Sequence, residues 1–248
     1  MKRAVDLVVS GTLLVLAAPV LVPVALLVWL QDFHSPFYLG TRAGRDEVPF
    51  RMVKLRSMRV NADRTGVDST SADDRRITPV GRFIRAYKLD ELMQLWNVLR
   101  GDMSLTGPRP NVLREVAIYT PAEKRLLTVR PGITDLASIV FSDEGEILEG
   151  AADPDLLYNQ IIRPWKSRLA LFHVDHASFG LDVRVIFLTA VAILSRERAL
   201  SGVERILRAL DAPPDLVAVA RRREPLPPAP PPGATSIVAS RSQVPSPL

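Results

Sequence analysis

The chain has 248 residues, enough for one globular domain of ordinary size and further segments. It contains no cysteine, which excludes disulfides and thiolate metal sites and is consistent with a reducing, cytoplasmic setting. Its net charge is +5, from 32 Lys and Arg against 27 Asp and Glu. This excess suits an anionic partner, but nucleic acid, acidic lipid and phosphorylated substrates satisfy it equally.

An uncharged apolar run over residues 7–30 lies near the start of the chain. The run is long enough for a membrane helix, which needs about 20 residues per span. A secretory signal peptide is the alternative, because Lys2 and Arg3 form a basic start. The run exceeds the roughly 7 to 15 apolar residues of such signals, and Asp6 precedes it, so a membrane anchor is favoured.

Two prolines, Pro19 and Pro23, lie in the middle of this run. Each removes a backbone donor and clashes with the preceding turn, which predicts a kink. Basic residues lie on both sides of the run, and the positive-inside tendency places both flanks in the cytoplasm. They are Lys2 and Arg3 before it and Arg42, Arg45 and Arg51 after it. The pattern predicts a re-entrant helical anchor over residues 1–36, with a single tilted span as the alternative because Asp32 and His34 precede the later basic residues.

Beyond the anchor, short strands, helices and loops are expected in chain order. The expected elements are extended pieces over 37–39 and 48–55, a polar surface loop over 61–76, a turn over 77–81 leading into two helical pieces, a turn and strand over 129–134, an acidic solvated loop over 141–149, and helices over 157–174 and 183–194. The last helix either rests on the membrane surface or packs in the core. Ten of the 21 prolines lie from residue 213 onward, so residues 211–248 are predicted to be a disordered basic tail.

The most informative segment is residues 88–110, KLDELMQLWNVLRGDMSLTGPRP. Apolar residues at helical spacing form a stripe there, which predicts a core-facing side and leaves Asp90, Gln94 and Asn97 together on a polar, solvent-facing side. Asp90 is expected in the first turn of the second helical piece, where the helix dipole favours a carboxylate and attracts phosphate. Neighbouring side chains on a helix point about 100° apart, so Asp90 and Glu91 are expected to have separate tasks. The plain alternative is a pair of acidic residues that only stabilises a helix start.

Two arginines near this pair favour a phosphate site. Arg85 precedes the pair and Arg109 follows it, and a guanidinium group presents a planar fork that matches phosphate oxygens. Prolines on both sides of Arg109 restrict the backbone that aims it.

Taken together, these motifs resemble the monotopic phosphoglycosyl transferases, also called the bacterial sugar transferase family, whose members are undecaprenyl-phosphate sugar phosphotransferases. The resemblance covers about residues 1–195. It includes the basic start and Asp6 before a proline-broken apolar helix, and the segments FRMVKLRSM, LDELMQLWNVLRGDMSLTGPRP, RPGIT and SFGLDVRVIF. The central block is the most specific of these.

The resemblance implies a mostly helical α/β fold. Residues 1–36 would form a re-entrant helix-break-helix anchor, and residues 37–200 a small cytoplasmic catalytic domain with amphipathic surface helices and short strands. The expected location is the cytoplasmic face of the bacterial inner membrane. No long N-terminal multi-span region precedes the anchor, so the chain is expected to be the minimal form of the family.

The implied reaction is transfer of a sugar 1-phosphate from a UDP-sugar to a polyprenol (undecaprenyl) phosphate, with release of UMP, as the first membrane step of glycan assembly such as exopolysaccharide biosynthesis. Asp90 would be the nucleophile of an aspartyl phosphosugar intermediate, with Glu91 assisting it. Mg²⁺ is expected at Asp90, because the diphosphate charge must be neutralised. Arg85, Arg109 and Lys54 match the family's substrate-binding residues. Membrane lipids and later glycosyltransferases of the same pathway are the expected partners.

Two positions depart from the family pattern. Ala18 stands where many members have serine before the helix-breaking proline, and Asp135 follows RPGIT where glycine is common. The segment from Asp135 to about Tyr158 is expected to vary with the sugar.

Three other function classes remain as alternatives. A non-catalytic membrane scaffold of a glycan-assembly complex, recruiting partners through the proline-rich tail, is the main one. A membrane-tethered nucleic-acid binder lacks a reader motif, so no nucleic-acid partner is expected. A glycosidase needs carboxylates about 5 to 9 Å apart across a sugar, unlike neighbours on one helix.

Overall fold

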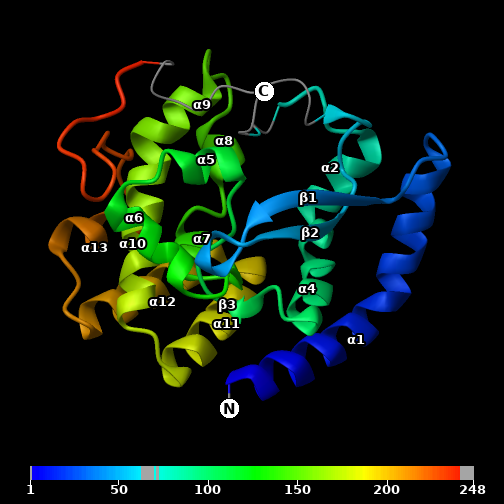
Figure 1. The fold of residues 1–248 in the computed structure, drawn as a ribbon, viewed down its shortest axis with the longest axis horizontal. Helices are drawn as coiled ribbons and strands as arrows, with labels where there is room; N and C mark the ends of the chain where they lie inside the picture. The colour runs from blue at the N-terminus through cyan, green and yellow to red at the C-terminus, as the bar shows by residue number, and fades with distance from the viewer. Residues whose placement is uncertain (1, 63–69, 71–72, 241–248) are drawn as a thin grey trace.

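The computed structural model describes residues 2–62, 70 and 73–240 (Figure 1). Helices make up most of this part of the chain, and the strands form two small sheets of two strands each. The predicted mostly helical α/β architecture with short strands is therefore confirmed. Most of the loop predicted over residues 61–76 lies outside the described residues.

The elements divide into an N-terminal and a C-terminal set. The first set is α1 (Lys2–Leu30), β1 (Phe37–Ala43), the 3-10 turn η1 (Arg45–Glu47), β2 (Pro49–Leu55), α2 (Pro79–Ala86), α3 (Leu89–Leu92), α4 (Gln94–Arg100) and β3 (Ser104–Thr106). The second set is α5 (Leu113–Ala117), α6 (Pro121–Lys124), the 3-10 turn η3 (Arg125–Thr128), β4 (Gly132–Thr134), α7 (Leu136–Val140), α8 (Glu144–Ile147), α9 (Pro154–Leu157), the π-helical turn η4 (Tyr158–Ile162), α10 (Arg163–Asp175), α11 (Phe179–Leu194), α12 (Arg196–Ala209) and α13 (Pro214–Arg221).

The apolar run forms α1, a single helix of 29 residues that contains both Pro19 and Pro23. The helix changes direction along its length (Figure 1), as two missing backbone donors and ring clashes predict. The expected helix-break-helix is wrong in one respect, because the helix continues through the prolines. Among the described residues, α1 is the one helix that is long and apolar enough to cross a membrane.

Both ends of α1 are bound to the rest of the protein by polar contacts. Near the N-terminus, Arg3 donates to the carbonyls of Val98 and Leu99 at 2.6 and 3.0 Å, and Asp6 accepts from Ser104 Oγ at 2.9 Å. Just beyond the C-terminus, Asp32 accepts two hydrogen bonds of 2.6 Å from Arg56.

Apolar contacts join the middle of α1 to the same body. Leu21, Val24 and Val28 are buried in a cluster with Leu55 of β2 and Ile84 of α2. Contacts along most of the helix therefore make α1 part of the packed structure.

A hairpin of β1 and β2 lies against α4, and the side chain of Asn97 joins the two. The backbone N–H of Val53 donates to Asn97 Oδ1 at 2.9 Å, and Asn97 Nδ2 donates to the Arg51 carbonyl at 2.7 Å. Asn97 and Gln94 are completely buried, and Asp90 is 8% exposed. The prediction that these polar residues share a solvent-facing side is wrong, because β2 covers that side of the helix.

The second sheet pairs β3 with β4 in parallel and positions the loop that contains Arg109. Gly107 has φ +152°, and a Cβ there would lie 2.7 Å from the Arg130 carbonyl oxygen. A Cβ on Gly132 would lie 2.2 Å from Gly107 N. Two glycines thus allow the two backbones to approach closely, which side chains would prevent.

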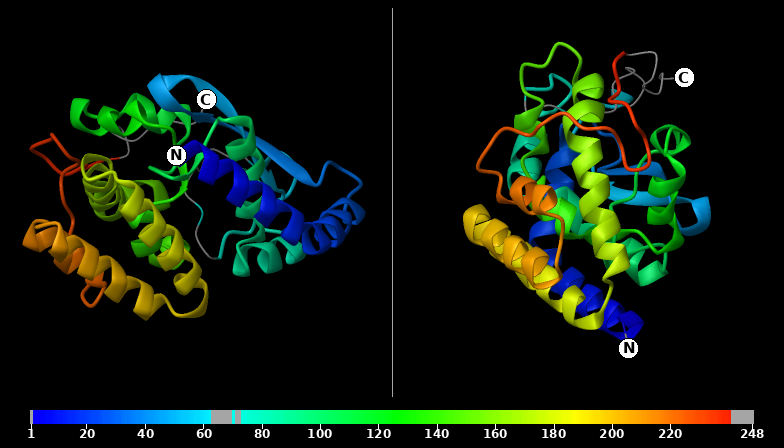
Figure 2. Two further views of the ribbon diagram at one scale, coloured as in Figure 1. Left: turned by 90° about the horizontal axis from the view of Figure 1, so that it is seen from below. Right: turned by 90° about the vertical axis from the view of Figure 1, so that its left-hand side faces the viewer.

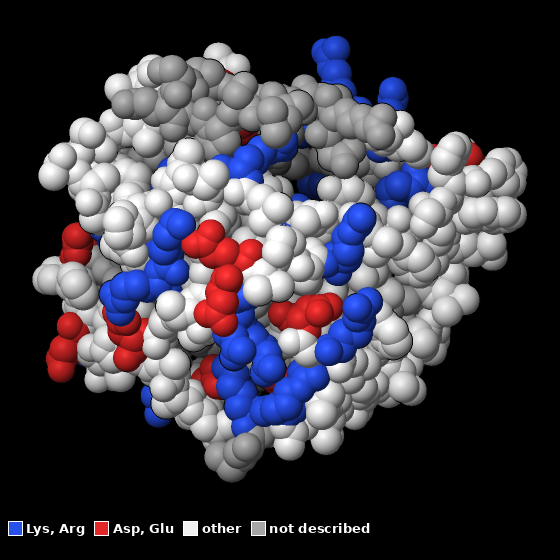
Figure 3. Space-filling view, viewed as in Figure 1, with Lys and Arg blue, Asp and Glu red and all other residues white. Residues whose placement is uncertain are grey.

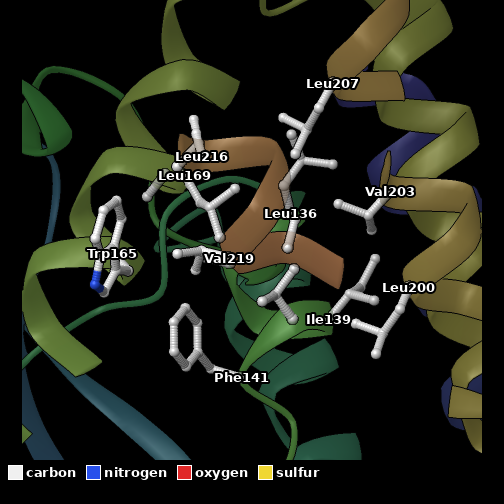
Figure 4. Close-up of a cluster of buried hydrophobic side chains, with 14 of the residues drawn as sticks. Leu136, Ile139, Phe141, Trp165, Leu169, Leu200, Val203, Leu207, Leu216 and Val219 are labelled. Carbon is white, nitrogen blue, oxygen red and sulfur yellow. The ribbon is translucent and has the colours of Figure 1, made fainter. Parts of the chain in front are cut away.

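The largest apolar core lies among α7, α10, α11, α12 and α13 (Figure 4). In α11, Leu181, Val185 and Leu188 face this core, whereas Phe187 and Leu194 are 67% and 90% exposed. The core-packing alternative for this helix is therefore confirmed for one of its faces.

The predicted disordered tail over residues 211–248 is wrong for α13 and the segment that follows it. Leu216 and Val219 are 4% and 7% exposed within the main core. The following segment crosses α10 (Figure 2), where its carbonyls at Pro227 and Pro230 accept hydrogen bonds from Trp165 and Arg168. The core of the domain predicted over residues 37–200 thus continues past residue 200.

The acidic stretch over residues 141–149 is also not a solvated loop. Residues Glu144–Ile147 form α8. Asp143 pairs with both Arg196 and Arg222 at 2.8 Å, and Glu144 pairs with Lys166 at 2.5 Å. Cations distant in sequence therefore hold this segment against the helices.

The packing of α13 leads to a stability prediction. Leu216→Ala should lower the free energy of unfolding by about 2 to 5 kcal/mol, because the substitution leaves a cavity in the main core. Arg223→Ala, at an exposed position just after α13, should change it by less than about 0.5 kcal/mol. Tryptophan fluorescence during denaturation in detergent micelles would measure both. Equal stability of the Leu216 variant and the parent would contradict the packing of α13.

Candidate active site

Two neighbouring carboxylates, on Asp90 and Glu91, lie in the first turn of α3, as the sequence predicts. The residue before this helix, Lys88, has φ +52°, and this left-handed residue turns the chain between α2 and α3. The first carboxylate faces β2, where Lys54 Nζ lies 3.6 Å from Asp90 Oδ2. Asp90 therefore lies at a helix start beside a cation.

The second carboxylate, on Glu91, has a different partner. Arg109 donates to Glu91 Oε1 at 2.5 Å and to Oε2 at 3.2 Å, and its Nη1 also reaches the Ile133 carbonyl of β4 at 3.4 Å. Because Asp90 and Glu91 bind different cations, they do not form a clamp around one ion, in agreement with the sequence prediction.

Glu91 and Arg109 shift each other's pKa values in opposite directions. Burial alone raises the pKa of Glu91, but the charge of Arg109, helped by Lys54, outweighs this effect and lowers the pKa to about 2. The charge of Glu91 is the main cause that raises the pKa of Arg109. Both groups therefore remain charged at neutral pH.

The cations around the dyad affect one another. Burial is the main cause that lowers the pKa of Lys54, and the charge of Arg109 lowers it further, whereas the charges of Asp90 and Glu91 raise it. Burial likewise lowers the pKa of Arg85, opposed by the charge of Asp90. Arg85 donates from Nε to Ser57 Oγ at 3.0 Å. The structure thus brings Lys54, Arg85 and Arg109 close to the two carboxylates.

Two neighbours of this site were not predicted. Arg42 of β1 lies within electrostatic range of Lys54 and Arg109, although its place after the apolar run suggested only a flanking charge. The second is Ser57, whose hydroxyl accepts the hydrogen bond from Arg85. Pairing of β1 with β2 brings Arg42 close to Lys54, and no local sequence pattern predicts this proximity.

Lys and Arg gather on the face that carries this hairpin, with Asp and Glu among them (Figure 3).

A small pocket with polar and apolar lining residues adjoins Arg109. Its lining includes Asn111, Tyr119, Asp135 and Lys166. Asp135 caps α7 by accepting from Ser138 N at 2.7 Å through Oδ1, and its buried Oδ2 has no partner among the described residues. The residue that departs from the family pattern thus presents a hydrogen-bond acceptor beside the candidate site.

The donor set around Asp90 can be compared with the needs of Mg²⁺. Within the described residues, no cluster of three or more His, Asp or Glu could hold a metal. Mg²⁺ usually binds one or two carboxylates together with substrate phosphates and waters, so a complete protein cage is not required. Asp90 has one described contact, with Lys54, and its partly accessible carboxylate fits such a role.

The low pKa of Glu91 leads to a prediction about acid stability. Because the pKa in the folded state, about 2, lies below the ordinary value of 4.5, the pair contributes stability that is complete above about pH 4.5 and is lost as the pH falls through about 2. Glu91→Gln lacks this contribution, so its melting temperature should fall less than the parent's between pH 5 and pH 2. Melting curves in detergent micelles at pH 7, 5, 3 and 2 would measure the difference.

The matched control for this experiment is Glu146→Gln, at an exposed position of α8. That variant should follow the parent's pH profile. If Glu91→Gln follows the same profile as well, the Arg109 pair does not contribute to folding stability.

Comparison with known proteins identifies the family. The family model described as bacterial sugar transferase matches residues 1–196. A UDP-glucose:undecaprenyl-phosphate glucose-1-phosphate transferase of Caulobacter vibrioides is 33% identical over 201 residues, which are 80% of this chain and 71% of that protein. A Klebsiella pneumoniae protein of the same name is 35% identical over 76% of this chain, which spans only 39% of that relative. An uncharacterized sugar transferase of Bacillus subtilis is 34% identical, with 79% of this chain and 89% of that protein covered. The resemblance inferred from the sequence is confirmed, and the chain belongs to the bacterial sugar transferase family.

Proposed function

We propose that this protein transfers a sugar 1-phosphate from a UDP-sugar to undecaprenyl phosphate, forming a polyprenyl-diphosphate-sugar and UMP as the first membrane step of glycan assembly. The observation that carries the proposal is the Asp90 carboxylate, held at a helix start 3.6 Å from Lys54 and surrounded by arginines, in a chain that matches this family. The names of the Caulobacter and Klebsiella relatives supply the substrate class.

The arrangement suits two successive displacements at one phosphorus atom. In the first, an Asp90 oxygen attacks the phosphorus that carries the sugar, and the bond from this phosphorus to UMP breaks, so that UMP leaves with the electron pair. In the second, an oxygen of undecaprenyl phosphate attacks the same phosphorus and releases the Asp90 carboxylate. The aspartyl phosphosugar is the intermediate between these steps.

Arg85, Arg109 and Lys54 would bind the phosphate oxygens and stabilise the charge that develops on them. These residues come from three different elements: Arg85 lies in α2, Arg109 in the loop after β3, and Lys54 in β2. Three cations from separate elements can contact the two phosphates of the donor from different sides.

Glu91 assists by orientation more than by proton transfer. A carboxylate with a pKa of about 2 is a weak base, and the second pKa of a phosphate monoester is near 6. While Arg109 holds it, Glu91 therefore does not readily deprotonate the lipid phosphate. Its two hydrogen bonds instead hold the Arg109 guanidinium in place.

Mg²⁺ is the proposed cofactor, and Asp90 would hold it together with phosphate oxygens of the donor. When bound, the ion would neutralise diphosphate charge and favour departure of UMP. Arg85 and Arg109 add positive charge at the same place, so the metal would share this task with them.

The proposed location is the cytoplasmic face of the inner membrane, with α1 as a re-entrant anchor. The contacts of Arg3 and Asp6 at one end, and of Asp32 at the other, tie both ends of α1 to one body. A straight span would separate these ends by the thickness of the bilayer. The apolar side chains of α1 that face away from the body, such as Val8, Val15 and Val22, would then contact lipid.

A non-catalytic scaffold that recruits partners through its tail is less favoured. The proline-rich segment up to residue 240 packs on α10 by hydrogen bonds from Trp165 and Arg168. A segment used in this way inside the fold is not a free docking tail.

The reaction is tested by UMP release. With undecaprenyl phosphate, Mg²⁺ and a panel of UDP-sugars, the parent should release UMP from at least one donor. Asp90→Asn should reduce the rate at least about 10³-fold, because a carboxamide is a poor nucleophile toward phosphorus. Asp46→Asn, at an exposed left-handed position that suits asparagine, should keep the parent's rate. No release from any donor by folded protein in lipid nanodiscs would favour the scaffold.

The anchor is tested by labelling. The chain contains no cysteine, so Phe33→Cys places a single thiol just beyond α1. A re-entrant anchor predicts that a membrane-impermeant maleimide labels this thiol only after the cells are permeabilised. Glu224→Cys, after α13, is the control and should behave in the same way. Labelling of Phe33→Cys in intact cells would reject the re-entrant arrangement without affecting the proposed chemistry.

A further inference from the structure

A cavity of about 510 Å³ lies at the N-terminal end of α1. Its walls come from the start of α1, from β3 and the loop after it, from residues 128–130 and from the C-terminal end of α10. Small-molecule sites have volumes of about 300 to 1,000 Å³, so the cavity is large enough for a ligand. Pro108 lines both this cavity and the small pocket beside Arg109, but neither the dyad nor its three predicted cations are among the described residues of the cavity wall. The cavity is therefore a second candidate site.

Four cations from separate parts of the chain line this cavity. They are Lys2, Arg3, Arg45 and Arg130, whereas Asp6 is the one carboxylate among the described lining residues. Asp6 already accepts hydrogen bonds from β3. The first backbone N–H groups of α1 add positive potential, because a helix start leaves them without partners in the helix. The cavity thus favours an anionic ligand.

Two of these cations have no carboxylate at ion-pair distance among the described residues. Arg3 donates to two backbone carbonyls of α4, which leave its positive charge uncompensated. Arg130 is exposed, and its side chain makes no hydrogen bond or ion pair within the described part of the chain. Lys2 and Arg45, by contrast, each lie within 3.2 Å of a carboxylate oxygen. An anionic group could therefore compensate the two free guanidinium charges.

A buried histidine in the cavity wall has an unused ring nitrogen. His173 is 2% exposed, and its Nε2 lies 3.8 Å from Asp182 Oδ1. Its Nδ1 is buried and has no hydrogen-bond partner among the described residues, although buried polar atoms are nearly always paired. Nδ1 donates to a phosphate oxygen when the ring is protonated, and accepts from a phosphate hydroxyl when the ring is neutral. A phosphate group thus suits both this nitrogen and the neighbouring cations.

Apolar helix surfaces adjoin the cavity. The N-terminal end of α1 lies beside α11 (Figure 2), where Lys2 Nζ donates to Asp182 Oδ2 at 2.9 Å. Val8 and Val15 of α1 are 68% and 73% exposed, and Phe187 of α11 is 67% exposed. Apolar helix faces next to cations are typical of a membrane interface, where the cations attract anionic lipid headgroups. A membrane lipid is therefore the nearest source of phosphate for this cavity.

We propose that the cavity binds the phosphate group of an anionic lipid headgroup, at a site separate from the dyad. Arg3 and Arg130 compensate its charge, and Nδ1 of His173 makes a hydrogen bond with it. The bound headgroup joins the start of α1 to the loop after β3 and to α10. A ligand that binds only the folded protein stabilises it by mass action, so the site should be detectable as thermal stabilisation.

The test measures the melting temperature of the full chain in detergent micelles during titration with dioctanoyl phosphatidylglycerol. Dioctanoyl phosphatidylcholine, which has a phosphate but no net charge, and inorganic phosphate are titrated in parallel. For the parent, phosphatidylglycerol should raise the melting temperature to a plateau, and the other two should raise it less. Arg130→Gln should increase the half-saturating concentration of phosphatidylglycerol at least about tenfold, because a charge-assisted contact is lost. Without lipid, this variant should melt as the parent does, because the side chain is exposed and unpaired.

Two variants control for charge and for the dyad. Arg223→Gln makes the same change of charge at an exposed position after α13, away from the cavity. Arg85→Gln removes a cation beside the dyad instead. Both variants should respond to phosphatidylglycerol as the parent does. No UDP-sugar is present, so the result does not depend on whether the proposed reaction occurs.

Four results would overturn the proposal. If Arg130→Gln responds like the parent, the cavity does not bind the headgroup. If Arg85→Gln loses the response instead, the lipid binds at the dyad. Equal stabilisation by inorganic phosphate would make a free anion the ligand, and equal stabilisation by phosphatidylcholine would reduce the effect to general contact with lipid.

Discussion

The ion pair between Arg109 and Glu91 is the interaction on which the site depends. It joins the loop after β3 to α3, and the same guanidinium reaches the Ile133 carbonyl of β4. One cation therefore joins the helix that contains Asp90 to the sheet beside the small pocket. The close approach of Gly107 and Gly132 makes this possible, because it brings the two loops together. Arg42 and Lys54 lie within electrostatic range of Arg109, which adds positive charge beside the pair.

Local patterns predicted the site better than its surroundings. The spacing of residues 88–110 was sufficient to place Asp90 in a first helical turn. Arg85 and Arg109 were chosen for their guanidinium groups, which flank the acidic pair in the sequence. The same spacing gave the wrong environment for Gln94 and Asn97, because a helical pattern distinguishes polar from apolar sides and not solvent from a covering strand. Here β2 covers the polar side of the helix, and the side chain of Asn97 makes hydrogen bonds with the backbone of this strand at Val53 and Arg51. Arg42 was missed for the same reason, since strand pairing is not visible in a single local pattern.

Composition misled where distant partners decide the structure. The proline-rich segment lacks backbone donors, which predicted disorder, yet proline carbonyls still accept hydrogen bonds and those at Pro227 and Pro230 do so. The acidic segment near Asp143 read as solvated because its arginine partners lie more than fifty residues away. In both cases the stabilising group belongs to a helix that only the tertiary fold brings near.

The attachment of α1 along the body has a consequence for how the protein is made. Asp6 and Ser10 are buried in α1, and within the described part of the chain Asp6 accepts its hydrogen bonds from β3, which the ribosome delivers about a hundred residues later. An isolated α1 would therefore carry an unpaired carboxylate into the hydrocarbon, which is costly. Insertion of this helix and folding of the domain should consequently form one cooperative event, completed after synthesis of the catalytic segment.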